Sequence, residues 1–228
     1  KRFFTTPIYY VNDVPHIGHA YTSIAVDFLA RFSRLSGDET RFLTGTDEHG
    51  LKIQKAAEKL SISSLELCNK NSEIFRNLTK TLNLSNDDFI RTTEDRHKDG
   101  ATYLWNLLFE KGDIYLDEYT GWYSVNDETF YNEKDLIKQN DGTFKTITGG
   151  PVEWIKEESY FFKLSKYQEK LLNYYNENHD FILPESKRNE VINFVNSGLK
   201  DLSVSRTSFD WGIQVPDNSD HIIYVWLD

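Results

Sequence analysis

Methionine is absent from this 228-residue chain, and cysteine occurs only once, at Cys68. A single thiol excludes an internal disulfide and a zinc site built from several thiolates, and it fits a reducing compartment. There is no run of about 18 apolar residues, and the mean hydropathy is -0.58, so a membrane-spanning helix is excluded. The first residues also lack the apolar core of a secretion signal. These absences predict a cytoplasmic protein with no membrane partner.

Positive charge is scarce as well. The chain has 26 Lys and Arg residues against 36 Asp and Glu, which gives a formal net charge of -10. Such a surface disfavours nonspecific binding of nucleic acid, so no DNA partner is expected and any contact with RNA must be local. The remaining composition, 39% hydrophobic and 14% aromatic, is typical of a folded protein. Because the chain starts without methionine and stops in an apolar run, it is interpreted as a piece of a longer protein.

Two strand-loop-helix units open the sequence. Residues 3–9 are rich in β-branched and aromatic residues, and the apolar positions from Ile17 to Leu35 recur at spacings of three and four up to Gly37. A second strand is predicted at 40–44 and a second helix at 51–60. Consecutive units of this kind imply a parallel sheet, so the fold class is expected to be α/β.

The later part of the chain changes character after Lys111. Before it, helices are predicted at 64–82 and 94–111 with a strand at 89–91 between them. Beyond it, short aromatic-rich runs separated by turn residues predict antiparallel hairpins, with strands at 114–119, 122–125 and 129–131, and helices return at 165–177 and 184–195. We therefore expect a first sheet domain at 1–114, an inserted domain at 115–217, and a returning segment at 218–228 whose strand spans 222–227.

The sequence His16-Ile17-Gly18-His19 stands at the start of the first predicted helix. Free N–H groups and the helix dipole attract anions at such a position, and two histidines three residues apart can face the same point beyond the helix end. Gly18 has no side chain to keep a nucleotide away. The motif therefore indicates a phosphate site, and the plainer alternative is two surface histidines beside a turn glycine, or half of a metal site.

Several stretches, in order along nearly the whole chain, resemble one known family, the class I aminoacyl-tRNA synthetases, and within them the methionyl-tRNA synthetases. These stretches are residues 9–19, which contain the HIGH-type motif, and residues 42–50, 153–162, 206–212 and 224–228. The resemblance implies a Rossmann-like parallel sheet, incomplete at its carboxyl end, with an inserted α+β connective-peptide domain. It also implies a ligase reaction in which ATP, with Mg²⁺, and L-methionine give methionyl adenylate, whose methionyl group passes to tRNA(Met).

The resemblance also assigns roles to individual residues. It makes His16 and His19 the catalytic pair that hydrogen-bonds the ATP phosphates, and it gives Gly18 the task of admitting the nucleotide. Asp47 follows the second strand, at the edge where open parallel sheets bind ligands, and by family position it pairs with the methionine ammonium group. From spacing alone, Asp47 is also compatible with an N-cap for a helix that begins near His49.

The methionine side chain would be walled by three apolar residues. By family position these are Ile8, Tyr10 and Trp226, and a thioether gains dispersion and sulfur contacts against aromatic rings. Without the resemblance, all three would be interpreted as core residues.

Two departures from the family pattern limit what this chain is expected to do. Zinc-bearing relatives have cysteines where this chain has residues 124–127 and 148–151, so a zinc-free inserted domain is expected. The family's KMSKS loop and anticodon-binding helices are also missing, so the chain alone is expected to be inactive and prone to aggregate. The alternatives left open are another class I synthetase or a nucleotidylyltransferase, and a noncatalytic homologue that binds adenylate or an amino acid.

Overall fold

The protein is described by a computed structural model that covers residues 1–124, 129–139 and 141–228. It divides into two compact units, one formed by residues 1–103 together with 208–228, and the other by residues 104–207. The expected domain boundaries, after residues 114 and 217, lie later in the chain than this division. The first boundary differs because the division after residue 103 falls inside the helix Asp95–Glu110, whereas the sequence pattern assigned that whole helix to the first domain.

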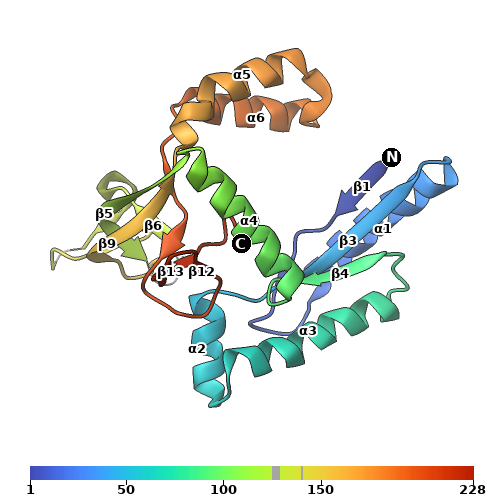
Figure 1. Cartoon of the computed structure of the whole chain (residues 1–228), viewed down its shortest axis with the longest axis horizontal. Coiled ribbons are helices and arrows are strands. Elements are labelled where there is room, and N and C mark those ends of the chain that lie inside the picture. Colours follow the sequence, from blue (N-terminus) through green and yellow to red (C-terminus); the bar gives the residue numbers. More distant parts are fainter. Residues whose placement is uncertain (125–128, 140) are drawn as a thin grey trace. The chain divides into compact units, whose positions relative to one another are not determined.

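A parallel sheet forms the centre of the first unit, as expected for the α/β fold class. Its strands are β1 (Arg2–Thr5), β2 (Tyr9–Tyr10), β3 (Thr40–Asp47) and β4 (Asp88–Arg91). β1 and β2 follow each other along one side of β3, and β4 lies on the other side, because Thr46 pairs with both Tyr9 and Arg91. β1, β3 and β4 are seen together in Figure 1. A Cβ atom at Gly45 would collide with the Ile90 carbonyl, so glycine is required for this close pairing.

Four helices accompany this sheet in the sequence: α1 (Ile17–Leu35), α2 (Leu51–Leu60), α3 (Ser64–Thr81) and α4 (Asp95–Glu110). Each lies within two residues of its predicted bounds. Local residues explain the ends: Gly37 has φ 89° just after α1, and the Ser63 hydroxyl caps α3 by accepting from the Glu66 N–H at 3.2 Å. The core packs α2 and α3 against the sheet through Tyr9, Val11, Ile53, Ala57, Leu67, Cys68, Phe75 and Phe89.

Helix α1 has its polar face inside. Its buried residues include Ser23, Asp27 and Ser33, which form hydrogen bonds with Tyr9, Ser85 and Thr40 respectively. Its large apolar side chains lie on the opposite face and are mostly exposed, with exposed fractions from 49% to 88%: Ile17, Tyr21, Ile24, Phe28, Leu29, Phe32 and Leu35. We call these seven residues the α1 stripe.

The end of the chain differs from the prediction. The strand expected at 222–227 is wrong in its extent, because β13 spans Asn218–Ile223 and pairs antiparallel with β12 (Gln214–Val215). Residues 225–227 form a turn, closed by the Leu227 N–H donating to the Tyr224 carbonyl at 2.9 Å. Val225 and Trp226 are exposed there, so the apolar run was not the sign of a buried strand.

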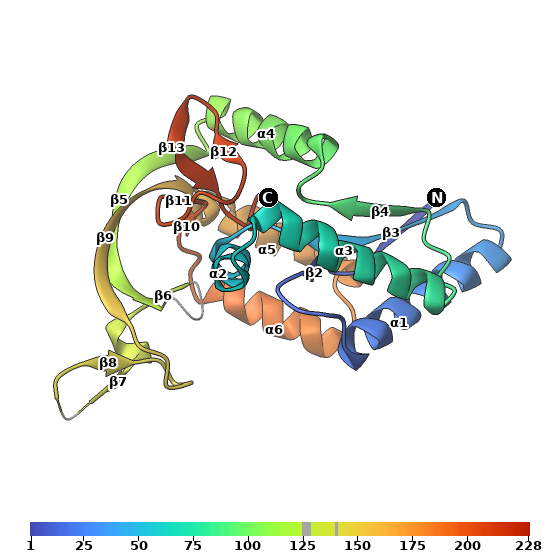
Figure 2. The same ribbon diagram turned by 90° about the horizontal axis from the view of Figure 1, so that it is seen from below.

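The second unit is built on a long antiparallel pair. β5 (Ile114–Ser124) and β9 (Glu153–Phe162) pair along their length, with β6 (Thr129–Tyr131) beside β5 and β10 (Leu202–Ser203) beside β9. Figure 2 shows the strong curvature of this pair. The two strands predicted at 114–119 and 122–125 are one strand, with Val125 outside the described residues, and β9 was not predicted.

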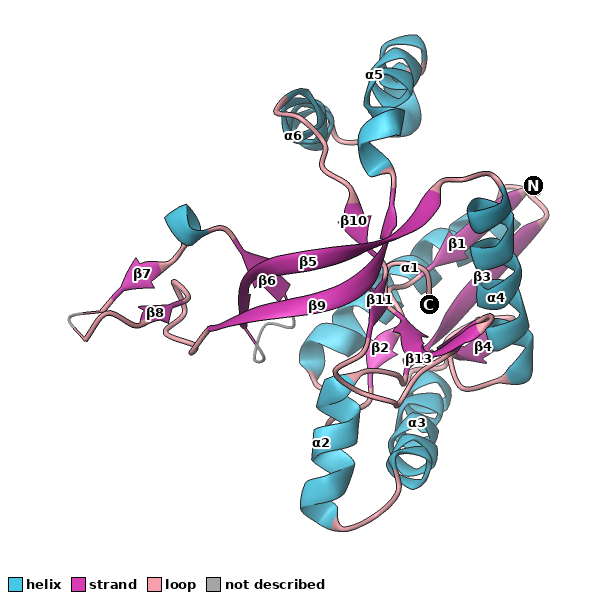
Figure 3. Cartoon of the chain, turned by 60° about the vertical axis from the view of Figure 1, so that its left-hand side comes forward, coloured by secondary structure: helices cyan, strands magenta, loops and turns pink. Residues whose placement is uncertain are grey.

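Shorter elements complete the second unit, and Figure 3 shows them by type. β7 (Ile137–Lys138) and β8 (Phe144–Lys145) form a small hairpin, and β11 spans Ser205–Arg206. The helices are α5 (Gln168–Glu177) and α6 (Glu185–Asn196), close to the predicted 165–177 and 184–195. Short 3-10 turns lie at Glu133–Asp135, Leu164–Tyr167 and His179–Phe181. Across the described ranges, no helix is both long and apolar enough to cross a membrane.

Candidate active site

The candidate residues gather where the parallel strands end. β2 ends at Tyr10 and leads to the HIGH-type motif at the start of α1, while β3 ends at Asp47. The register pairs Tyr10 with Asp47, so these two predicted residues are neighbours on adjacent strands. The carboxyl edge of a parallel sheet is where open α/β folds bind ligands. The geometry at this edge therefore decides what the site can do.

The two histidines of the motif cap helix α1. His16 is the N-cap residue, and its Nδ1 accepts from the Gly18 N–H at 3.1 Å, while His19 Nδ1 accepts from the His16 N–H at 3.0 Å. This is a reciprocal capping arrangement in which imidazoles take the places of the usual hydroxyl and carboxylate. The rings lie 3.9 Å apart between centroids. Both histidines thus have a structural role as helix caps, which is compatible with the phosphate site and with the plainer alternative of two surface histidines beside a turn glycine.

This capping fixes the proton positions on both rings. A neutral imidazole that accepts at Nδ1 carries its proton on Nε2, so each ring presents an Nε2–H donor. Burial and, next, the neighbouring His16 lower the pKa of His19, which favours the neutral ring at physiological pH. The Tyr9 and Phe75 rings, which stack on each other, both contact the His19 ring edge-on, at centroid distances of 4.8 and 5.1 Å. His16 and His19 therefore offer two Nε2–H hydrogen-bond donors beside the N-terminus of α1.

Gly18 has a structural task that the sequence did not reveal. A Cβ atom at this position would lie 2.9 Å from His16 Cε1 and 3.1 Å from His16 Nδ1. The absence of a side chain thus lets the His16 ring fold back over the helix start. Gly18 is also exposed, which is compatible with its predicted role of admitting a nucleotide.

Asp47 is a buried carboxyl group, with 8% of the residue exposed. Burial and, secondarily, the negative charge of Asp228 raise the pKa of Asp47 to about 7, against the opposing effect of His49. The alternative in which Asp47 caps the next helix is wrong, because α2 has Gly50 as its N-cap, with no side-chain cap hydrogen bond. A buried carboxylate gains most from a cationic partner.

Asp228 is a part of this site that the sequence analysis did not single out. One carboxylate oxygen lies 2.6 Å from His49 Nδ1 and the other 2.8 Å from His97 Nε2, and the Asp228 side chain is only 4% exposed. Burial alone would raise the pKa of Asp228, but the hydrogen bonds from the two histidines hold it below its usual value. No local signal predicted this, because His49, His97 and Asp228 come from three distant segments.

The three predicted side-chain contacts for methionine differ in exposure. Ile8 is half-buried, whereas Tyr10 is 43% and Trp226 60% exposed. The interpretation of all three as core residues is therefore wrong for the two aromatic ones. Trp226 lies in the turn before Asp228, whose bonds to His49 and His97 tie that turn to the edge of the sheet.

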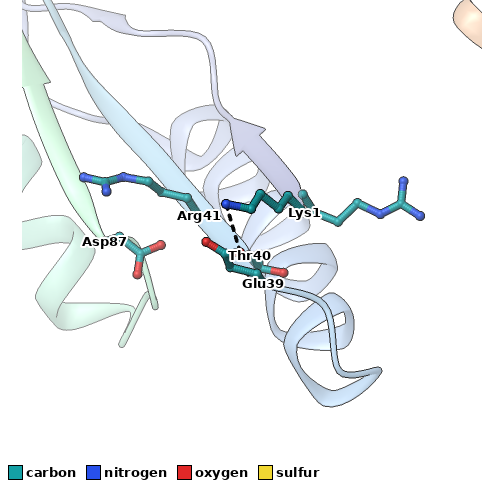
Figure 4. Close-up of a pocket in the computed structure, with 6 residues that line it drawn as sticks. Lys1, Glu39, Thr40, Arg41 and Asp87 are labelled. Atoms are coloured by element: carbon teal, nitrogen blue, oxygen red, sulfur yellow. Dashed lines mark ion pairs between the residues drawn. The ribbon is translucent and has the colours of Figure 1, made fainter.

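The opposite edge of the sheet carries a different hollow. A cavity of about 390 Å³ is lined by Lys1, Arg2, Glu39, Thr40, Arg41 and Asp87. Figure 4 shows that Lys1 and Glu39 close part of it through an ion pair of 3.3 Å. β1 and β3 begin there, so this cavity lies at the amino ends of the strands and away from Asp47. It is not the candidate active site.

Comparison with known proteins identifies the family. The sequence model of the protein family described as tRNA synthetases class I (M) matches residues 2–140 and 141–228 of this chain. The chain belongs to the methionyl class I tRNA synthetases. A methionine–tRNA ligase of Rickettsia felis is 60% identical over 226 residues, and one of Rhizobium meliloti is 58% identical over 226 residues. In both cases 99% of this chain is covered.

A solved methionyl-tRNA synthetase has the same fold. The Mycobacterium tuberculosis enzyme in complex with methionyl-adenylate superposes with a TM-score of 0.93 at 52% identity, covering 100% of this chain and 45% of that one. The expected Rossmann-like class I fold with a connective insertion is confirmed. The chain spans 43% and 44% of the length of the two curated relatives, so it is less than half of a methionyl-tRNA synthetase of that length.

Proposed function

We propose that the chain supplies the ATP-binding and methionine-binding residues of a methionyl-tRNA synthetase, which joins methionine and ATP into methionyl adenylate and pyrophosphate and then transfers the methionyl group to tRNA(Met). The observation that carries this proposal is that a buried carboxyl group and a helix start capped by imidazoles belong to the same edge of the sheet: Asp47 pairs in register with Tyr10, and β2 leads from Tyr10 to the start of α1. The first suits an ammonium group and the second suits phosphate.

The phosphate side of the reaction falls to His16 and His19. The methionine carboxylate attacks the α-phosphorus, a new carboxylate–phosphorus bond forms, and the bond to the pyrophosphate oxygen breaks with its electron pair leaving on pyrophosphate. No covalent protein nucleophile is needed, so the enzyme contributes position and charge stabilisation. The Nε2–H groups of His16 and His19 donate to phosphate oxygens, most strongly as charge develops on them. Gly18 leaves room for the nucleotide at the helix start.

The amino-acid side of the reaction falls to four residues. The Asp47 carboxylate binds the methionine ammonium group, while Ile8, Tyr10 and Trp226 surround the thioether. The exposure of Tyr10, which pairs in register with Asp47, and of Trp226, two residues before Asp228, supports this, because large exposed aromatic side chains are suited to a ligand rather than to the core.

The remaining features of the proposal concern partners and setting. Mg²⁺ enters with ATP, held by the triphosphate oxygens as part of the substrate. The inserted domain is proposed to bind no structural zinc: residue 124 is serine, and the lone Cys68 is buried on α3, where its thiol donates to the Glu48 carbonyl at 3.4 Å. We place the enzyme in the cytoplasm, in line with its single thiol.

Methionine-dependent exchange of pyrophosphate into ATP, measured on the full-length gene product, tests this function. Exchange with methionine, and much weaker exchange with leucine or isoleucine, is expected. Exchange that prefers another amino acid would instead indicate a different class I synthetase. Binding of methionyl adenylate without any exchange would indicate a noncatalytic homologue.

A further inference from the structure

The residue between Asp47 and His49 is a glutamate that no solvent reaches. Glu48 has 0% exposure, so it does not touch a substrate. Its two neighbours in the chain lie at the candidate site, Asp47 as the buried carboxyl group and His49 as a partner of Asp228. A group in this place acts on the reaction only through what it holds in position.

The Glu48 carboxylate is fully engaged by side chains from β3 and from the end of β4. Oε1 accepts from Thr46 Oγ1 at 2.7 Å and from Arg91 Nε at 2.7 Å. Oε2 accepts from Arg91 Nη2 at 2.9 Å and from Thr93 Oγ1 at 2.6 Å. Arg91 thus binds both oxygens with its planar fork, a geometry that fixes direction as well as distance.

The Glu48 backbone is held as firmly as its side chain. Its N–H donates to Thr92 Oγ1 at 3.0 Å, just where β3 has ended and the ladder to β4 no longer supplies a partner. Its carbonyl accepts from Trp211 Nε1 at 2.5 Å and from Cys68 Sγ at 3.4 Å. Glu48 is therefore anchored to β4, to α3 and to the segment around Trp211.

We propose that Glu48 and Arg91 are positioning residues for methionine binding: their ion pair, with Thr93, holds the turn that carries Asp47, so that the Asp47 carboxylate meets the ammonium group at the correct place. This inference rests on the proposed function, in which Asp47 binds that group. A small displacement of the Asp47 carboxylate weakens its contact with the ammonium group. Methionine binding is therefore expected to weaken, whereas ATP binding, which does not involve Asp47, is not.

The test uses the full-length enzyme with Arg91→Lys and, separately, Thr93→Val. Lysine keeps the charge and loses the two-pronged contact, while valine removes one hydrogen bond to Oε2 and keeps the shape. We expect the KM for methionine in pyrophosphate exchange to rise about tenfold in Arg91→Lys and about threefold in Thr93→Val, with the KM for ATP within about twofold of wild type.

Arg96→Lys is the matched control. Arg96 also binds a carboxylate with two nitrogens, at 2.7 and 3.0 Å from Asp88, but it has no contact with Glu48 among the described residues. If Arg96→Lys only destabilises the fold, its melting temperature falls while its KM for methionine and its KM for ATP stay at the wild-type values. The same rise in Arg96→Lys, or an equal rise for ATP and methionine in the Arg91 variant, would overturn the inference.

The outcomes also separate this inference from the proposed function. If the wild-type enzyme shows no methionine-dependent exchange, the proposed function fails. If the wild type is active but both variants keep the wild-type methionine KM, the function stands and the positioning role is wrong. Should Arg91→Lys fail to fold, the milder Thr93→Val decides the question.

Discussion

The ionisation of Asp47 is expected to control methionine binding near neutral pH. The pKa of Asp47 is raised to about 7, chiefly by burial, and an ammonium group binds a carboxylate much better than a carboxylic acid. Below this pKa, binding must first remove the proton. The affinity for methionine therefore rises about tenfold per pH unit as the pH approaches 7 from below, equivalent to about 1.4 kcal/mol per unit, and then levels off.

The same raised pKa has the opposite effect on the unliganded protein: its free energy of unfolding falls as the pH rises, whereas the affinity for methionine rises. Between pH 3.8 and about 7 the folded protein retains a proton that the unfolded chain has lost, so this residue makes the free energy of unfolding fall as the pH rises. Above pH 7 the full cost, at most about 4 kcal/mol, is present. Asp47→Asn removes that cost, so the variant is expected to melt at a higher temperature than wild type at about pH 8 while it loses methionine binding.

Calorimetric titration of the full-length enzyme with methionine measures the effect directly. At about pH 6, 7 and 8, in two buffers of different ionisation enthalpy, binding is expected to release roughly 0.9, 0.5 and 0.1 protons. Asp47→Asn is the control for the stability change, and no heat of methionine binding is expected from it at any of these pH values. An affinity that stays constant from pH 6 to 8, with no proton release, would refute the assignment of Asp47 as the ammonium partner.

Four further outcomes are expected. His19→Ala should lower kcat for adenylation by about two to three orders of magnitude, because a donor to developing charge acts mainly in the transition state; a rise in the ATP KM alone would contradict this. Gly18→Ala should displace the His16 ring and cost about 1 kcal/mol of stability, measured by denaturant unfolding, together with activity. Metal analysis of the dialysed protein should find no stoichiometric zinc. The 228-residue chain should exchange pyrophosphate far more slowly than the full-length enzyme, and equal rates would show that the rest of the protein is unnecessary for activation.

Local sequence signals predicted the helices of this fold well. The helix that begins at Ile17 was found because three- and four-residue spacing and Gly37 agree on its extent. The antiparallel part was predicted less well. β9 was missed because an edge-to-edge pairing with β5 depends on residues about 40 positions away, and the strand at 222–227 was misplaced because apolar composition does not distinguish a buried strand from an exposed turn.

The candidate site divides in the same way. The residues marked by a short motif or by family position, such as His16, His19 and Asp47, were available from the sequence. Asp228 and Glu48 could not be identified from the sequence, because each contributes through a partner that is distant along the chain. Asp228 is bound by His97, and Glu48 is bound by Arg91. Periodicity along a chain carries no information on such pairings.

The inverted polarity of α1 has a thermodynamic consequence. Seven large apolar side chains on one helix face exceed what a monomer normally leaves in water, so in the described chain the α1 stripe favours association with another apolar surface. Association of folded molecules stabilises the folded state by mass action. For this chain taken alone, the melting temperature and the apparent free energy of unfolding are then both expected to rise with protein concentration.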